Sequence, residues 1–307
     1  GSWLTYGLGS ENKNLPGFMV FSTGAGISGG AANWSSGFLP TTHSGVRLRN
    51  QGEPMLNLSR PSDISSVEDQ ATAAALRAMN AQRQRQELDP AIDARISSYE
   101  LAYRMQTEAP DVMDLSKESK ETLEMYGADP KVPSFARACL LARRMVERGV
   151  RFINIYHEGW DAHSDVVGNI TGNARATDKA SAALVTDLKQ RGLLDDTIVI
   201  WGGEFGRTPA VELPTPGANA GKMNGRDHNH WGFTYWMAGG GVKKGTVYGA
   251  TDEFGFKAVE KPVHVHDFHA TIMHLMGVKH EEFTYKHLGR RYRLTDVAGN
   301  VINDLIS

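Results

Sequence analysis

Along the second half of the chain, short apolar runs alternate with longer segments whose apolar residues recur at helical spacing. The run at 151–156 and the almost continuously apolar run at 197–202 predict strands. A run as continuous as the second is typical of a strand buried on both faces of a sheet. Further strands are predicted at 15–22 and 232–241, and helices ended by glycine at 134–149, 173–192 and 263–277. This alternation predicts an α/β fold, with a mainly parallel sheet covered by helices on both faces.

The segment 63–126 differs from this pattern. It is rich in Ala, Arg, Gln and Glu, and its apolar residues are spaced three and four apart, which predicts amphipathic helices. Pro90 suits the first turn of the second helix, and Gly127 follows the last one as a stop signal. We therefore expect one α/β domain over 1–307, with 63–126 as a helical insertion or cap within it.

Composition argues against several classes of protein. Hydrophobic residues make up 40% of the chain and charged residues 22%, as in an ordinary globular protein. The formal net charge of -2 gives no basic excess for a nucleic-acid surface. No run of apolar residues reaches the roughly 18 needed for a membrane helix. Cys139 is the only cysteine, so neither a disulfide framework nor a thiolate metal cluster can form within one chain.

Histidines and carboxylates gather where the predicted strands end. "HEGWDAHSD" follows the strand at 151–156, "GGEFGRTP" follows the strand at 197–202, and "GRDHNHWG" leads into the strand at 232. The carboxyl ends of parallel strands lie at one edge of a sheet, where ligands bind. We expect a cluster there of Asp161, His163 and Glu204 with His228 or His230. Carboxylate and imidazole ligands without sulfur suit zinc, manganese and related divalent ions.

Each of these residues also has a purely structural interpretation. His157 can donate to a backbone carbonyl beside its strand. Asp161 and His163 can form a hydrogen-bonded surface turn, and Glu204 can form a local ion pair with Arg207.

Other histidines and other chemistries have weaker support. His230 stands beside Trp231 and can be its packing partner. There is no H-E-x-x-H, and Cys139 lies inside a helical pattern, unlike a nucleophile. Capping and packing at the edge of the core is favoured over metal binding for the histidines of the predicted helix at 263–277, namely His264, His266, His269 and His274.

The motifs "GWDAHSD", "GGEFGRTP", "GRDHNHWGFTYWMAGGGVKKG" and "VHVHDFHATIMHLMG" occur in this order, followed by "YRLTDVAGNVINDL". Together they resemble a bacterial domain-of-unknown-function family, number 1501, whose members are often labelled sulfatase-like. The resemblance covers the whole chain. It implies the alkaline phosphatase and sulfatase superfamily, an alkaline phosphatase-like sheet with metal bound at strand ends, and a periplasmic or exported location.

The resemblance also assigns roles to particular residues. Asp161 and His163 resemble the metal-binding pair that follows a central strand of the superfamily. Glu204 stands where sulfatases have a metal-binding Asp, and His228 resembles the later histidine that completes the site. Phe205 stands where many relatives carry His or Asn, which implies that a second metal would be poorly supplied.

The activity implied is that of a hydrolase of phosphate or sulfate esters, carried by small molecules or carbohydrates. It would use a divalent zinc, manganese or calcium ion to polarise the ester. Arg207 is the candidate clamp for a non-bridging oxygen, since its planar fork suits both anions. A degenerate relative that binds carbohydrate or peptide without turnover is the alternative, and a metal-dependent hydrolase or isomerase of another class is a third. A homo-oligomer is compatible with all three.

The opening segment "GSWLTYGLGSENKNLPGF" is turn-rich and has no initiator Met. The family's first strand, first metal-binding Asp and nucleophile would lie upstream of it. The sequence therefore predicts an N-terminally incomplete chain that lacks its first strand and is inactive by itself.

Overall fold

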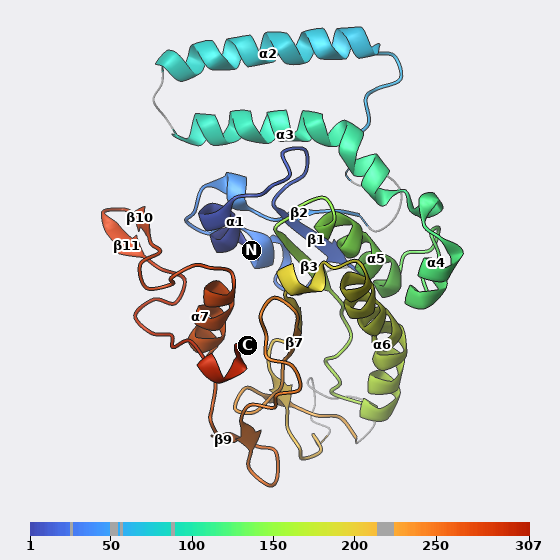
Figure 1. Ribbon diagram of the computed structural model, residues 1–307, viewed down its shortest axis with the longest axis vertical. Coiled ribbons are helices and arrows are strands. Elements are labelled where there is room, and N and C mark those ends of the chain that lie inside the picture. Colours follow the sequence, from blue (N-terminus) through green and yellow to red (C-terminus); the bar gives the residue numbers. More distant parts are fainter. Residues whose placement is uncertain (25–26, 50–54, 56–57, 87–89, 214–223) are drawn as a thin grey trace. The chain divides into compact units, whose positions relative to one another are not determined.

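The computed structural model describes residues 1–24, 27–49, 55, 58–86, 90–213 and 224–307 (Figure 1). They form a mixed α/β protein whose chain divides into two compact units, 1–157 and 158–307. Whether the whole chain acts as one domain stays a prediction. Among the described helices, none has both the length and the apolar character that a membrane span requires.

The first unit is built on a parallel sheet of three strands in the order β2 (Val46–Arg47), β1 (Phe18–Ser22) and β3 (Phe152–Tyr156). The central strand β1 is buried along its whole length. Helix α5 (Phe135–Val146) packs beside β3 and adds some of the most deeply buried apolar side chains of the unit, including Leu140, Leu141 and Met145. The strands predicted at 15–22 and 151–156 and the helix predicted at 134–149 are thus confirmed. The unit also contains α1 (Ser2–Leu8) and the short 3₁₀ helices η1 (Gly30–Trp34) and η2 (Thr41–His43).

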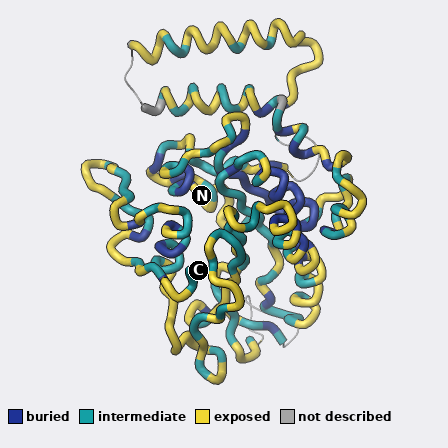
Figure 2. The backbone as a smooth tube through the Cα atoms, viewed as in Figure 1, coloured by how far each residue is buried: buried dark blue, intermediate teal, exposed yellow. Residues whose placement is uncertain are grey.

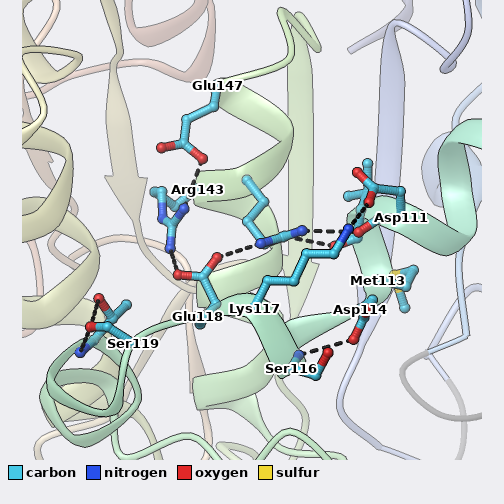
Figure 3. A network of polar contacts seen from close by, with 12 residues as sticks. Asp111, Met113, Asp114, Ser116, Lys117, Glu118, Ser119, Arg143 and Glu147 are labelled. Carbon is cyan, nitrogen blue, oxygen red and sulfur yellow. Dashed lines mark hydrogen bonds and ion pairs between the residues drawn. The ribbon is translucent and has the colours of Figure 1, made fainter.

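A buried ion network holds α5 against the segment before it (Figure 3). The Glu118 side chain is only 7% exposed, and it accepts hydrogen bonds from Arg143 at 2.6 Å and Arg144 at 2.5 Å. Arg143 also donates to Glu147 at 2.7 Å. Burying a charge is costly unless it is paired, so these contacts keep both guanidinium groups compatible with the core. They fix the 3₁₀ helix η3 (Leu115–Lys117) and α4 (Lys120–Tyr126) beside α5.

The segment 63–126 is helical, as expected. Helices α2 (Ser66–Gln86) and α3 (Pro90–Met113) lie side by side, and Pro90 is the first residue of α3 (Figure 1). Met105, Ala109 and Val112 form a buried stripe on the second half of α3. Helix α2 differs, because its described residues are mostly exposed (Figure 2). The amphipathic pattern is thus realised in α3 and not in α2, and the role of this segment as a cap stays a prediction.

The described residues of the second unit form a long helix, a shorter helix and several short antiparallel strand pairs. Helix α6 (Val166–Gln190) comes first, and β4 (Val199–Trp201) then pairs with β7 (Trp236–Ala238). The helix predicted at 263–277 is α7 (Val265–Leu275). His264 caps it: its ring accepts the His266 N–H, and its own N–H donates to Asp267 at 3.1 Å. The other elements are η4 (Leu194–Asp196), β5 (Gly206–Arg207), β6 (His228–Asn229), β8 (Ala250–Thr251), β9 (Ala258–Glu260), β10 (Tyr285–His287), β11 (Arg290–Tyr292) and η5 (Asn303–Leu305).

The prediction of a mainly parallel sheet was too broad. Within the described part of the chain, parallel pairing is confined to β1, β2 and β3, and every other ladder is antiparallel. Ile200 in the middle of β4 is 38% exposed, so this strand is not buried on both faces as its apolar run predicted. An apolar run indicates burial in general, but it carries no information on the partner or its direction. The partner of β4 lies more than thirty residues away, at the end of a long connection.

Candidate metal centre

The loop that opens the second unit presents Asp161 and His163 on adjacent tight turns. The Ala162 N–H donates to the Trp160 carbonyl at 3.0 Å, and the His163 N–H donates to the Asp161 carbonyl at 3.2 Å. The Ala162 side chain is buried and anchors the loop. The Asp161 carboxylate and the His163 ring consequently face each other, with Oδ1 and Nε2 2.9 Å apart.

A short hairpin-like ladder brings the remaining partners to Asp161. Strands β5 and β6 pair so that Arg207 lies opposite His228, and the Thr208 N–H extends the ladder to the Asp227 carbonyl at 2.8 Å. His228 Nε2 lies 3.0 Å from Asp161 Oδ1, and Arg207 Nη1 lies 2.5 Å from the same oxygen. The cluster is therefore assembled inside the second unit by an antiparallel ladder. The expected route, through two parallel strand ends of one sheet, was wrong, because β3 and β4 pair with different partners.

The segment entering β6 is tied directly to the Asp161 loop. The Arg226 N–H donates to the Ala162 carbonyl at 2.9 Å, and the Asp165 N–H donates to Asn224 Oδ1 at 2.8 Å. Between these contacts, a Cβ atom on Gly225 would lie 1.8 Å from the His163 carbonyl oxygen. Only glycine allows so close a backbone approach. Gly225 thus sets the distance between the two loops that carry the cluster.

Asp161, His163 and His228 point their ligand atoms at one small space. The carboxylate Oδ1 and the two Nε2 atoms are separated by 2.9, 3.0 and 3.2 Å. Around a tetrahedral zinc ion with bonds of about 2.0–2.1 Å, neighbouring ligand atoms lie about 3.3 Å apart. The three atoms therefore need to spread by only a few tenths of an ångström to surround an ion, and their donor types fit zinc and manganese.

Glu212 orients His163 from outside this set. Its Oε2 atom lies 2.7 Å from His163 Nδ1, and its side chain is only 12% exposed. The hydrogen bond with Glu212 raises the pKa of His163 above its ordinary value. In the neutral ring this bond keeps the proton on Nδ1, so the Nε2 lone pair faces Asp161 and His228. A carboxylate oxygen and a ring lone pair then face one another, and a cation between them removes their repulsion.

Asp161 itself is held as a carboxylate. Its partial burial acts to raise the pKa, but the hydrogen bond from His228 and the positive charge of Arg207 outweigh that effect. The pKa of Asp161 therefore lies below its ordinary value. An ionised carboxylate is the form that binds a metal.

The other predicted residues lie around the cluster. Glu204 is 61% exposed and accepts from Arg207 Nη2 at 3.0 Å, so it reaches the three ligand atoms only through that arginine. The exposed His230 ring lies 4.3 Å from the ring of Trp231. Phe205 packs its ring 4.6 Å from the ring of His228.

His157, the first histidine of the opening motif, lies in the first unit. Its Nδ1 atom is 2.7 Å from Thr23 Oγ1, and its ring packs on Phe135. A side-chain hydroxyl is thus one partner of the His157 ring, and the expected bond to a backbone carbonyl stays a prediction.

Sequence reasoning did not single out Glu212. Glu212 follows "TPAV", a stretch without helical or strand-like spacing of apolar residues. It reaches His163 because an antiparallel bridge pairs Glu212 with Gly225, which lies against the Asp161 loop. Only the folded backbone reveals this contact.

The fold and the cluster describe a mixed α/β protein with a carboxylate–imidazole site on one of its units. The family described as "Protein of unknown function (DUF1501)" matches residues 1–306, and the chain belongs to this family. A comparison with curated proteins found no match, and a comparison with solved structures found none either.

Proposed function

We propose that the protein is a metal-dependent hydrolase of phosphate or sulfate esters on an alkaline phosphatase-like fold. The observation that carries the proposal is the convergence of Asp161, His163 and His228, with Arg207 on the same carboxylate oxygen. A metal site next to an arginine fork is an arrangement suited to tetrahedral oxyanions. An exported location is part of the proposal and comes from the family resemblance alone.

Asp161, His163 and His228 would hold the ion. Two imidazoles and one carboxylate favour zinc or manganese over calcium, which prefers a shell of oxygen ligands. Three protein ligands with an open fourth position are typical of catalytic zinc sites. When bound, the ion would polarise the phosphoryl or sulfuryl oxygen. Glu212, bonded to His163 Nδ1, would orient the His163 ring for binding the ion.

Arg207 is the group that would bind the ester's charged head. Its side chain is held between Asp161 and Glu204, with its two terminal nitrogens on different carboxylates. This arrangement fixes the plane of the guanidinium, so less conformational entropy is lost when it binds a non-bridging oxygen. Glu204 then serves as a positioning residue for Arg207.

A binding protein without turnover is the second candidate, and Phe205 favours it. The Phe205 ring covers one side of His228 and also lies under the Arg207 guanidinium, 5.4 Å from ring centre to Cζ. An apolar ring at this point supplies no ligand for a second ion and no group for proton transfer. The site would then hold a carbohydrate or peptide ligand, in a monomer or a homo-oligomer.

Turnover of nitrophenyl phosphate and nitrophenyl sulfate separates the two candidates. The protein is stripped with EDTA and assayed with added zinc, manganese or calcium. The proposal predicts metal-dependent release of nitrophenol from one of the esters, lost in His228→Ala and kept in the control His287→Ala, which changes a histidine outside the cluster. Such turnover would contradict the expectation from the sequence that this chain is inactive by itself. Metal binding by the cluster with no turnover of either ester would contradict the hydrolase and favour the binding protein.

A further inference from the structure

A cavity of about 600 Å³ lies in the second unit, next to the candidate metal centre along the chain. Its walls are three tryptophans, Trp160, Trp201 and Trp236, and one face of α6. The volume falls in the range of about 300–1,000 Å³ typical of small-molecule sites.

The tryptophans form a continuous aromatic wall. Trp201 on β4 and Trp236 on β7 are direct partners across the ladder, so their side chains lie on the same face of the strand pair. The Trp160 ring stands edge-on to Trp201, with centroids 5.8 Å apart and planes at 87°. Trp236 remains 37% exposed. Burying this aromatic surface would stabilise the fold, so its exposure has a free-energy cost. An exposed aromatic surface of this kind commonly marks a binding site.

The opposite wall does not fill this space. The residues of α6 that line it recur at the spacing of one helix face and include Asp178, Ser181, Ala182 and Val185. A face that served only to pack on the strands would carry large apolar side chains here. Small and hydroxyl-bearing residues instead leave room, and they provide hydrogen-bonding groups across from the aromatic rings.

The side chains that line the cavity suit a sugar ring. A pyranose ring has an apolar C–H face that stacks on tryptophan and a rim of hydroxyls that hydrogen-bond to carboxylates and hydroxyl groups. Among the described residues that line the cavity, only Asp178 is charged, and its negative charge disfavours a phosphate or sulfate group. The cavity therefore fits the neutral part of a ligand.

The cavity and the metal centre share two chain segments. Trp160 immediately precedes Asp161, and Trp201 stands three residues before Glu204. Consecutive Cα atoms are only about 3.8 Å apart, so a ligand against Trp160 is close to the Asp161 loop. We propose that the cavity is a carbohydrate subsite that holds the sugar part of the ester substrate. The substrate assignment rests on the proposed function, but sugar binding by the cavity does not need the metal.

The test is sugar binding by the whole chain in EDTA, so that the metal plays no part. Maltose, cellobiose and lactose are titrated while tryptophan fluorescence and heat of binding are recorded, with choline as the probe for a cation bound by the aromatic rings. We expect saturable binding of at least one sugar. Trp236→Ala should weaken it by about tenfold or more, because one stacking wall is lost. The matched control is Trp231→Ala, which removes an exposed tryptophan outside the cavity.

A second variant guards against misfolding of Trp236→Ala. Ala182→Leu keeps every tryptophan but fills the space between the walls, and it should abolish sugar binding with an unchanged circular dichroism spectrum. Failure of all three sugars to bind, or binding of choline instead, would overturn the subsite. If ester turnover is nevertheless metal-dependent, the proposed function stands without it. If the sugars bind and no ester is turned over, the subsite stands and the hydrolase is contradicted.

Discussion

Replacement of Glu212 by alanine tests the positioning of His163 most specifically. Glu212 lies outside the three ligand atoms, and its carboxylate lies 2.7 Å from His163 Nδ1. With His163 and Asp227 it also forms a second carboxylate–imidazole group. Without Glu212, the imidazole can place its proton on either nitrogen and can rotate about its Cβ–Cγ bond. Both changes reduce the fraction of rings whose Nε2 lone pair faces the site.

The magnitude follows from the burial and charge of this contact. Glu212 is largely buried, so water does not fully replace its carboxylate as a partner for the ring. Loss of an outer partner of a metal-binding histidine typically weakens metal affinity by about 10–100-fold. This corresponds to about 1.4–2.7 kcal/mol of binding free energy. Glu212→Gln should fall in between, because the amide oxygen still accepts from Nδ1 but carries no charge.

Zinc affinity is measured by competition with a chromophoric chelator at neutral pH and checked by calorimetry. Glu282→Ala is the matched control, because it removes an exposed glutamate that lies outside the cluster. The control should bind zinc as the unmodified protein does. If Glu212→Ala keeps its zinc affinity within about twofold, a positioning role of the size expected for such a partner is refuted.

Three further predictions follow from contacts outside the ligand set. Glu118→Gln should lower the unfolding free energy by about 3–5 kcal/mol, because Arg143 and Arg144 stay buried without their carboxylate. Burial acts to raise the pKa of Glu118, but these arginines hold the pKa below its ordinary value. The stabilisation by Glu118 is therefore present at neutral pH and is lost as the pH falls through its folded-state pKa. Urea unfolding measured at several pH values should show a weaker loss of stability in acid for the variant. Gly225→Ala should cost about 1–3 kcal/mol in thermal unfolding and weaken zinc binding, since its Cβ would overlap the His163 carbonyl; unchanged zinc affinity would contradict the close approach. Leu140→Ala should lower the free energy of unfolding by about 2–5 kcal/mol, because Leu140 is fully buried. Leu76→Ala on the exposed α2 should change the free energy of unfolding by no more than about 0.5 kcal/mol, and equal losses in the two variants would show that α2 is covered.

Local patterns predicted the elements well where the signal was contained in a few neighbouring residues. The strand 151–156, the helix 134–149 and the first-turn proline of α3 all depend on near-neighbour spacing and were confirmed. The direction of strand pairing was not predictable in this way. The partner of β4 comes from a distant segment, and a continuous apolar run is equally compatible with a parallel or an antiparallel neighbour.

The candidate site shows the same division. Asp161, His163 and His228 were identified because histidines and carboxylates stood beside predicted strands, and the structure brings these three together. Their contacts with Glu212 and with the backbone at Gly225 depend on a bridge between two irregular segments, for which the sequence has no periodic signal. The cavity beside Trp160 was missed for a similar reason, since its walls come from a loop, two strands and a helix.

Metal content measured after equilibrium dialysis tests whether Asp161, His163 and His228 bind a divalent ion. The purified protein is dialysed against zinc or manganese, separated from free ion and analysed by mass spectrometry, beside the double variant His163→Ala/His228→Ala and the control His287→Ala. We expect about one ion per chain in the unmodified protein and the control, and a large loss in the double variant, which retains only Asp161 of the three ligands. An unmodified protein that retains no ion, or a double variant that retains as much as the control, would contradict this expectation.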